Sequence, residues 1–104
     1  MISNLHKLFF LKVIFVGFCN SCGRPIVRAD YGTNKDGSLN EDYCKDCFQN
    51  GEYTEPDITL TEMIVRKSKE MMDKNPRLAE TTATGITTGF LPGLKRWNPE
   101  FQKK

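Results

Sequence analysis

Histidine is nearly absent from this sequence. Among its 104 residues the only histidine is His6. A hydrolytic triad needs a histidine that a serine and a carboxylate can both reach, and no such set can be assembled around a residue so near the N-terminus. At 104 residues the chain also has no room for two independent hydrophobic cores. We therefore expect one small domain that is not an enzyme.

Long hydrophobic runs are absent as well. The most apolar stretch, Leu8 to Phe18, is interrupted by Lys12 and is far shorter than the roughly 20 residues of a membrane-spanning helix. No cleavage site with small residues follows it, as a secretory signal would require. We predict a cytoplasmic protein without membrane contact, in which residues 1–12 are a weakly ordered leader or follow a mis-called start, and Val13 to Phe18 form a strand. Membrane targeting by this stretch is the alternative.

A strong excess of one charge is also missing, because the formal net charge is only +2. The charges are nevertheless unevenly distributed along the chain. Residues 19–57 contain four basic and eight acidic residues, whereas residues 58–104 contain nine basic and five acidic ones. Since the phosphate backbone of nucleic acids attracts positive surfaces, the acidic segment is a poor match for it. Only the C-terminal segment could offer nucleic acid a basic surface.

Cysteine is scarce, but its four copies are grouped. They form two C-x2-C pairs, Cys19 with Cys22 and Cys44 with Cys47, which residues 23–43 separate. Two such pairs at this spacing are typical of a tetrahedral zinc site with four thiolate ligands. We predict one structural Zn²⁺ per chain, held by Cys19, Cys22, Cys44 and Cys47. A secreted miniprotein with disulfides between these cysteines is the alternative.

Residues 13–57, which surround the cysteines, predict a zinc ribbon built from short β-hairpins. Gly23 favours a sharp turn with positive φ that directs backbone N–H groups at the sulfur atoms. Asp36 and Gly37 predict the turn of a hairpin. A segment of this size is near the ~40 residues below which a domain usually needs a metal or disulfides to fold. Zinc should therefore stabilise the segment in place of a large apolar core.

Residues 58–97 predict a helical extension that packs on the ribbon. Thr59 and Glu62 form a capping box that should start one main helix. The helix should end near Lys74, because the residue before Pro76 is pushed away from helical geometry. The predicted fold class is therefore a small α+β metal-stapled domain, a zinc ribbon followed by one main C-terminal helix and a short closing turn or helix.

The last part of the chain predicts little regular structure. The stretch from Thr81 to Gly89 is rich in threonine and glycine, so we expect a loose connection there. Leu91, Leu94 and Trp97 should then lie on one side of the closing turn, with Trp97 as a plug of the core. Residues 98–104 should form a disordered tail.

Several of these motifs together resemble one known family. The motifs are Cys19-Asn-Ser-Cys-Gly-Arg-Pro-Ile26, Gly32-Thr-Asn-Lys-Asp-Gly-Ser38, Tyr43-Cys-Lys-Asp-Cys-Phe-Gln-Asn-Gly-Glu-Tyr53 and Leu91-Pro-Gly-Leu-Lys-Arg-Trp97. They are similar to those of the small bacterial and archaeal "putative zinc ribbon" family, over residues 19–97. The resemblance implies the same four cysteine ligands. The chain departs from the family at Arg24, where a methionine is usual, and at residues 81–89, where relatives tend to be helical.

The resemblance says little about activity, because the family has no settled one, although some relatives are fused to transcription regulators. Four thiolates fill a tetrahedral site and leave no position for water, so hydrolytic zinc chemistry is not expected. We predict a non-enzymatic module that contacts a protein partner, in transcription regulation, and takes no small-molecule substrate. Nucleic-acid binding by the basic helix from Leu60 and the tail is one alternative. A thiol-based redox switch is another.

Overall fold

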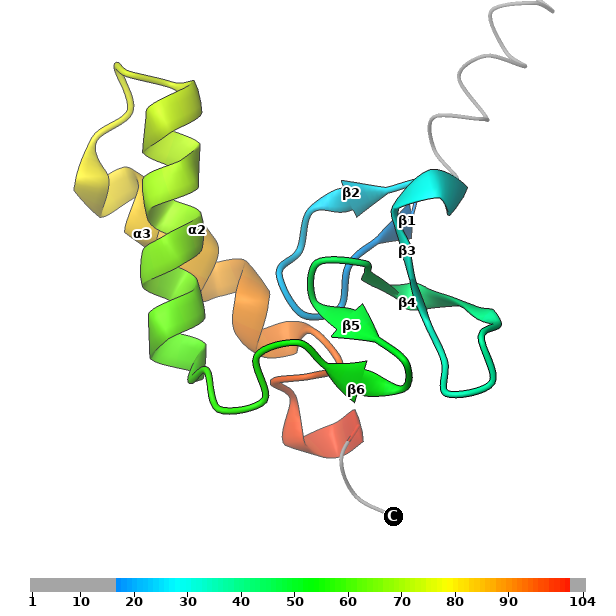
Figure 1. The fold of residues 1–104 in the computed structure, drawn as a ribbon. Coiled ribbons are helices and arrows are strands. Elements are labelled where there is room, and N and C mark those ends of the chain that lie inside the picture. Colours follow the sequence, from blue (N-terminus) through cyan, green and yellow to red (C-terminus); the bar gives the residue numbers. More distant parts are fainter. Residues whose placement is uncertain (1–16, 102–104) are drawn as a thin grey trace, which may run out of the picture.

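The computed structural model describes residues 17–101, which form three β-hairpins followed by two α-helices (Figure 1). The strands are β1 (Gly17–Phe18), β2 (Pro25–Ile26), β3 (Tyr31–Thr33), β4 (Leu39–Cys44), β5 (Phe48–Gln49) and β6 (Glu52–Tyr53). The helices are α2 (Leu60–Lys74) and α3 (Glu80–Phe90), with short 3-10 turns at η1 (Arg28–Asp30), η2 (Leu91–Gly93) and η3 (Pro99–Phe101). The predicted leader, residues 1–12, and all but the end of the strand predicted from Val13 lie outside the described residues.

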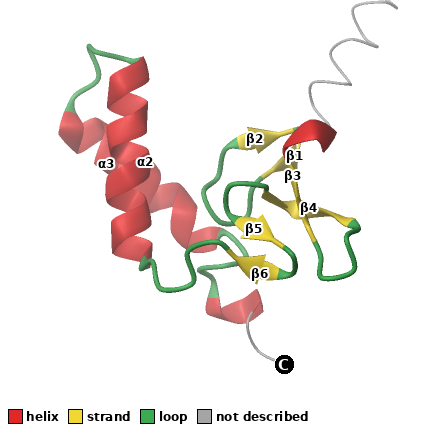
Figure 2. Ribbon diagram, in the orientation of Figure 1, coloured by secondary structure: helices red, strands yellow, loops and turns green. Residues whose placement is uncertain are grey.

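The hairpins form one half of the molecule and the two helices form the other (Figure 2). The core lies where the halves meet, because Ile26, Met63, Leu91 and Leu94 pack in one buried cluster with the four cysteines. This arrangement confirms the predicted fold class, with a second helix added. Within residues 17–101, no helix is both long enough and apolar enough to cross a membrane.

Turn residues set the geometry of the hairpins. β3 and β4 are joined through Asp36 and Gly37, as predicted, and the Asp36 carboxylate accepts a hydrogen bond of 3.0 Å from the backbone N–H of Ser38. β5 and β6 are joined through Asn50 and Gly51, whose φ angles are 54° and 81°. Two successive residues with positive φ give the turn that matches the twist of a two-stranded hairpin. Local sequence therefore fixes both turns.

The main helix begins and ends as the sequence predicts. The Thr59 hydroxyl accepts a hydrogen bond from the backbone N–H of Glu62 (3.1 Å), and the Glu62 carboxylate accepts one from the backbone N–H of Thr59 (2.9 Å). This reciprocal pair is the predicted capping box, and it satisfies N–H groups that the first turn leaves without partners. α2 ends at Lys74, directly before Asn75 and Pro76.

The prediction of a loose connection at Thr81 to Gly89 is wrong, because these residues belong to α3. Helix propensity counts against them, but tertiary packing outweighs it. Ala83 and Thr87 lie one turn apart on the buried face of α3, and α3 packs against α2. The hydroxyl of Thr87 donates to the carbonyl of Ala83 at 2.8 Å, which lets a polar residue be buried there. Small residues on this face allow the close approach of the two helices.

The closing turn follows α3 directly. Leu91 and Leu94 are buried in the core, and Trp97 packs against it, which confirms the predicted role of these residues. The expectation of a disordered tail from residue 98 fails for Pro99–Phe101, which form η3. The side chain of Asn98 accepts a hydrogen bond from the backbone N–H of Glu100 at 2.9 Å and so caps this turn.

Candidate metal centre

Two strand connections bring the cysteine pairs together. Cys19 and Cys22 lie between β1 and β2, Cys44 is the last residue of β4, and Cys47 lies between β4 and β5. All four side chains are buried, and their sulfur atoms lie within 4.8 Å of one another. The structure thus gathers every predicted site residue in one cluster, which could hold one metal ion.

The backbone around the first pair is arranged to serve the sulfur of Cys19. That sulfur accepts hydrogen bonds from the backbone N–H of Ser21 (3.4 Å) and from the backbone N–H of Cys44 (3.2 Å). Gly23 has a φ of 81°, as predicted, and its N–H donates to the carbonyl of Cys19 at 2.8 Å. A residue with a Cβ adopts this conformation at a cost, which explains the glycine. The turn therefore positions donors that favour a negatively charged sulfur.

Without a metal, the thiols share protons unequally. Hydrogen bonds from the thiols of Cys22, Cys44 and Cys47 lower the pKa of Cys19, so this sulfur holds negative charge most readily. Hydrogen bonds to Cys19, Cys22 and Cys44, together with burial, raise the pKa of Cys47. A cation that binds all four sulfurs must therefore displace protons from the cluster.

The closing segment docks on the two residues inside the first cysteine pair. The side-chain carbonyl of Asn20 accepts a hydrogen bond from the backbone N–H of Lys95 (3.3 Å), and the backbone carbonyl of Asn20 accepts one from Arg96 (3.2 Å). The indole N–H of Trp97 donates to the backbone carbonyl of Ser21 at 2.7 Å. Polar groups of the first pair thus find their partners in residues 95–97, at the far end of the sequence.

Arg96 is the site residue that the sequence analysis missed. It is only 7% exposed, and its guanidinium donates to the hydroxyl of Ser21 (2.9 Å) and to the backbone carbonyl of Glu55 (2.7 Å). The same group lies 4.0 Å from the ring centre of Tyr53 and 4.6 Å from that of Trp97. The position of Arg96 beside Trp97 in the closing motif could have indicated that it is buried. Adjacent lysine and arginine residues, however, usually lie on the solvent-exposed surface.

Three aromatic rings support the second cysteine pair. Tyr43 stacks on Phe48 with ring centres 4.9 Å apart, and Tyr53 meets both rings edge-on. The hydroxyl of Tyr53 lies 2.9 Å from that of Tyr43, within hydrogen-bond distance. Tyr43 also packs against the core cluster that contains the cysteines. The rings therefore hold β4, β5 and β6 together around the end of the site.

Comparison with known proteins gives a family for this arrangement. No curated protein matches the chain, and no solved structure matches it. The model of one family, described as "putative zinc ribbon domain", matches residues 18–98. That match begins just before Cys19, ends just after Trp97, and includes both cysteine pairs, both helices and the closing turn. The chain therefore belongs to the putative zinc ribbon domain family.

Proposed function

We propose that this chain is a non-enzymatic zinc-binding module that mediates protein interaction in transcription regulation. In this proposal one Zn²⁺ is bound by Cys19, Cys22, Cys44 and Cys47, and its role is structural. The family match and the four-cysteine cluster support the zinc site. The transcriptional setting rests on the resemblance to proteins whose relatives include fusions to transcription regulators.

The observation that carries the zinc proposal is the spacing of the four sulfur atoms. A tetrahedral site with Zn–S distances of ~2.3 Å has sulfur atoms about 3.8 Å apart. Here the sulfurs of Cys22 and Cys44 are 3.9 Å apart, and all four lie within 4.8 Å of one another. The donor set fits the metal too, because four cysteines are typical ligands of structural zinc.

Four sulfur ligands support a structural role over a catalytic one. They complete a tetrahedral coordination sphere, whereas a catalytic zinc keeps one position for water or substrate. The cysteines also form half of the buried core, together with Ile26, Met63, Leu91 and Leu94. A core with so few large apolar side chains gains much of its folding free energy from the metal. Four reduced cysteines suit the cytoplasm, where we place the protein.

The pairing of basic side chains supports a protein partner over nucleic acid. Arg66 of α2 makes two hydrogen bonds to the carboxylate of Glu55, at 2.6 and 2.9 Å, and Lys67 pairs with Glu70. Lys95 lies 3.0 Å from the carboxylate of Asp42. Basic groups that already have carboxylate partners release fewer counterions on binding phosphates, which weakens the electrostatic attraction.

Native mass spectrometry of the purified full chain tests the zinc site. We expect one zinc ion per chain and four alkylatable thiols after denaturation with a chelator. A matched variant, Cys44→Ser, should lose the metal, whereas Ser38→Ala on the exposed β3–β4 turn should keep it. Intact disulfides without metal would contradict the zinc proposal and favour the disulfide alternative. Zinc lost only upon thiol oxidation, together with a reductase or chaperone effect, would favour the redox switch.

The partner proposal needs a separate experiment. The zinc-loaded chain is used to capture proteins from a lysate of its own cells, with and without nuclease treatment. A protein that is captured equally in both samples supports direct protein contact. Binding of duplex DNA or RNA at sub-micromolar affinity in physiological salt would contradict it and support the nucleic-acid alternative.

A further inference from the structure

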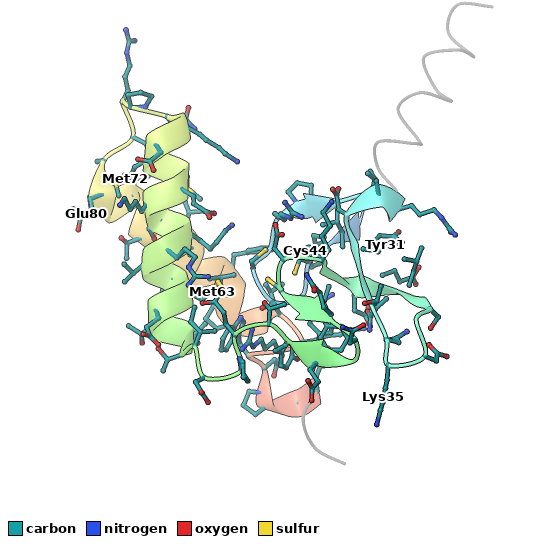
Figure 3. All side chains as sticks on the ribbon, in the orientation of Figure 1. Tyr31, Lys35, Cys44, Met63, Met72 and Glu80 are labelled. Carbon is teal, nitrogen blue, oxygen red and sulfur yellow. The ribbon has the colours of Figure 1, made fainter. Side chains whose placement is uncertain are left out.

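The cysteine cluster has one side that is open to small molecules. Cys19 and Cys44 are fully buried, whereas Cys22 and Cys47 are 8% and 9% exposed. A cavity of about 460 Å³ is lined by Cys22, Cys44 and Cys47, together with side chains of α2 such as Met63. Figure 3 labels Cys44 on the hairpin half and Met63 on the helix beside it. A chelator or an electrophile would reach the sulfur atoms through this cavity.

Among the described residues, backbone hydrogen bonds reach the sulfur of Cys19 but not those of Cys44 and Cys47, two of the three cysteines that line this cavity. The buried sulfur of Cys19 accepts two of them, from Ser21 and Cys44. Within residues 17–101, no such bond is made to the sulfur of Cys44 or Cys47. Four thiolates around one Zn²⁺ carry a net charge of −2, which needs compensation from neighbouring groups. At Cys44 and Cys47 a side chain can supply it.

Arg24 lies at this open side and has donors to offer. It lines the same cavity as the three cysteines. Its Nε and one terminal nitrogen, Nη2, are buried without a hydrogen-bond partner among the described residues, although Nη2 lies 3.5 Å from the carboxylate of Asp46. The side chain as a whole is 34% exposed, so water reaches part of it, but its buried N–H groups still favour a nearby acceptor. The thiolate sulfurs of the cysteines that line the cavity could accept hydrogen bonds from these N–H groups.

The electrostatic surroundings of Arg24 agree with this position. The guanidinium lines one cavity with Cys44 and with Asp46, whose carboxylate lies 3.5 Å from Nη2. Of the three other cations that line the cavity, Arg66 and Lys67 are already paired with carboxylates, and Lys74 lies at the C-terminal end of α2. Arg24 is also fixed at its backbone, because its carbonyl accepts a hydrogen bond of 2.8 Å from the N–H of Cys19.

We propose that Arg24 is a positioning residue of the metal site, which compensates the charge of the thiolates on the open side and so slows the loss of zinc. Asp46 holds the guanidinium in place from the solvent side. The proposal rests on the zinc site proposed above. It gives this chain a property that a methionine at the same position could not provide, because methionine has neither charge nor N–H donors.

The test compares zinc-loaded full chains that differ at one position. Arg24→Met removes the charge at similar length, and Arg24→Lys keeps the charge without the planar fork. Arg28→Met is the matched control, because Arg28 is exposed on η1. The rate of zinc transfer to a coloured chelator in excess is measured for each variant. The Co²⁺-loaded chains are also compared by their sulfur-to-cobalt charge-transfer absorption.

We expect Arg24→Met to release zinc about tenfold faster than the wild type, since second-shell partners typically change metal affinity by that order. Arg24→Lys should be intermediate and Arg28→Met unchanged. The charge-transfer band of Arg24→Met should move to longer wavelength, because removing a positive charge makes the thiolates easier to oxidise. A loss of packing alone would not produce this directional shift.

Two results would overturn the inference, and they are distinguishable. If the wild type binds zinc, but Arg24→Met releases it at the wild-type rate with an unshifted band, the role of Arg24 is refuted and the zinc site stands. If the wild type binds neither zinc nor cobalt, the proposed function and this inference fail together. Should Arg24→Met fail to fold, Arg24→Gln decides, because it removes the charge but keeps a polar side chain, and a wild-type release rate with an unshifted band in that variant would refute charge compensation.

Discussion

The guanidinium of Arg96 donates a hydrogen bond of 2.9 Å to the hydroxyl of Ser21, across 75 residues of sequence. Ser21 is fully buried between Cys19 and Cys22, and Arg96 is nearly so. Removing the arginine would leave the Ser21 hydroxyl and the carbonyl of Glu55 without their donor. This single side chain therefore joins the first cysteine pair, the end of the hairpins and the closing segment.

Arg96→Met should lower the free energy of unfolding of the zinc-loaded chain by about 2–4 kcal/mol, because two buried acceptors lose their partner. Urea unfolding followed by circular dichroism measures this. The matched control is Lys95→Met, which removes an ion pair with Asp42 whose side chains are both more than a third exposed. That control should cost less than about 1 kcal/mol. Equal effects of the two substitutions would contradict the role of Arg96.

Thr59→Ala should lower the free energy of unfolding by about 1 kcal/mol, because the first turn of α2 loses the hydroxyl that caps the N–H of Glu62. Thr61→Ala is the control, since Thr61 is exposed inside the same helix. The two variants are compared in one series of urea titrations. A Thr61→Ala variant as unstable as Thr59→Ala would show that the cap contributes nothing of its own.

Gly85→Ala should raise the free energy of unfolding by about 0.5–1 kcal/mol, because alanine favours a helix and a Cβ at this position meets no atom within 4 Å. Gly23→Ala should have the opposite effect. Gly23 has a φ of 81°, and an added Cβ would come within 2.5 Å of the ring of Phe90. The left-handed conformation alone costs a residue with a Cβ about 1–2 kcal/mol. Opposite shifts in melting temperature check both predictions.

Removal of the metal should unfold the helices as well as the hairpins. Met63 of α2 and Leu91 of η2 share one buried cluster with the cysteines, so the helical half loses its support when the sulfur atoms separate. Addition of a chelator should therefore abolish the far-ultraviolet helical signal, and addition of zinc should restore it. A helical signal that persists in excess chelator would show that α2 and α3 fold independently of the site.

Zinc affinity should fall as the pH is lowered. The pKa of Cys47 is raised by its hydrogen bonds to the other thiols and by burial, so this thiol carries a proton that zinc must displace. Lower pH favours the protonated, metal-free cluster, and higher pH favours the zinc-bound one. Competition with a chelator of known affinity at pH 6, 7 and 8 measures the effect. An affinity that does not change with pH would contradict the displacement of protons.

Local sequence signals predicted the features that depend on neighbouring residues. Gly23, directly after Cys22, predicted the sharp turn with positive φ that the structure shows. The capping box at Thr59 and Glu62 predicted the start of α2, because both partners lie within one helical turn. In each case the residue that determines the local conformation lies within a few residues of the turn or helix end that it forms.

Features that depend on distant residues escaped the sequence analysis. α3 is helical because Ala83 and Thr87 are buried where α3 packs on α2, and no local property of Thr81 to Gly89 indicates this. The burial of Arg96 likewise depends on acceptors at Ser21 and Glu55, far away in the sequence. Propensity and charge describe the isolated segment, whereas packing decides its conformation in the folded chain.

Because residues 95–97 dock on Asn20 and Ser21, the order in which residues are synthesised determines when the surroundings of the cysteines are completed. All four cysteines have been added to the growing chain by residue 47, but the donors that cover the first pair are added only at residues 95–97. A nascent chain can therefore gather its four cysteines while the polar groups of Asn20 and Ser21 are still hydrated. These groups gain their partners only when Trp97 has left the ribosome.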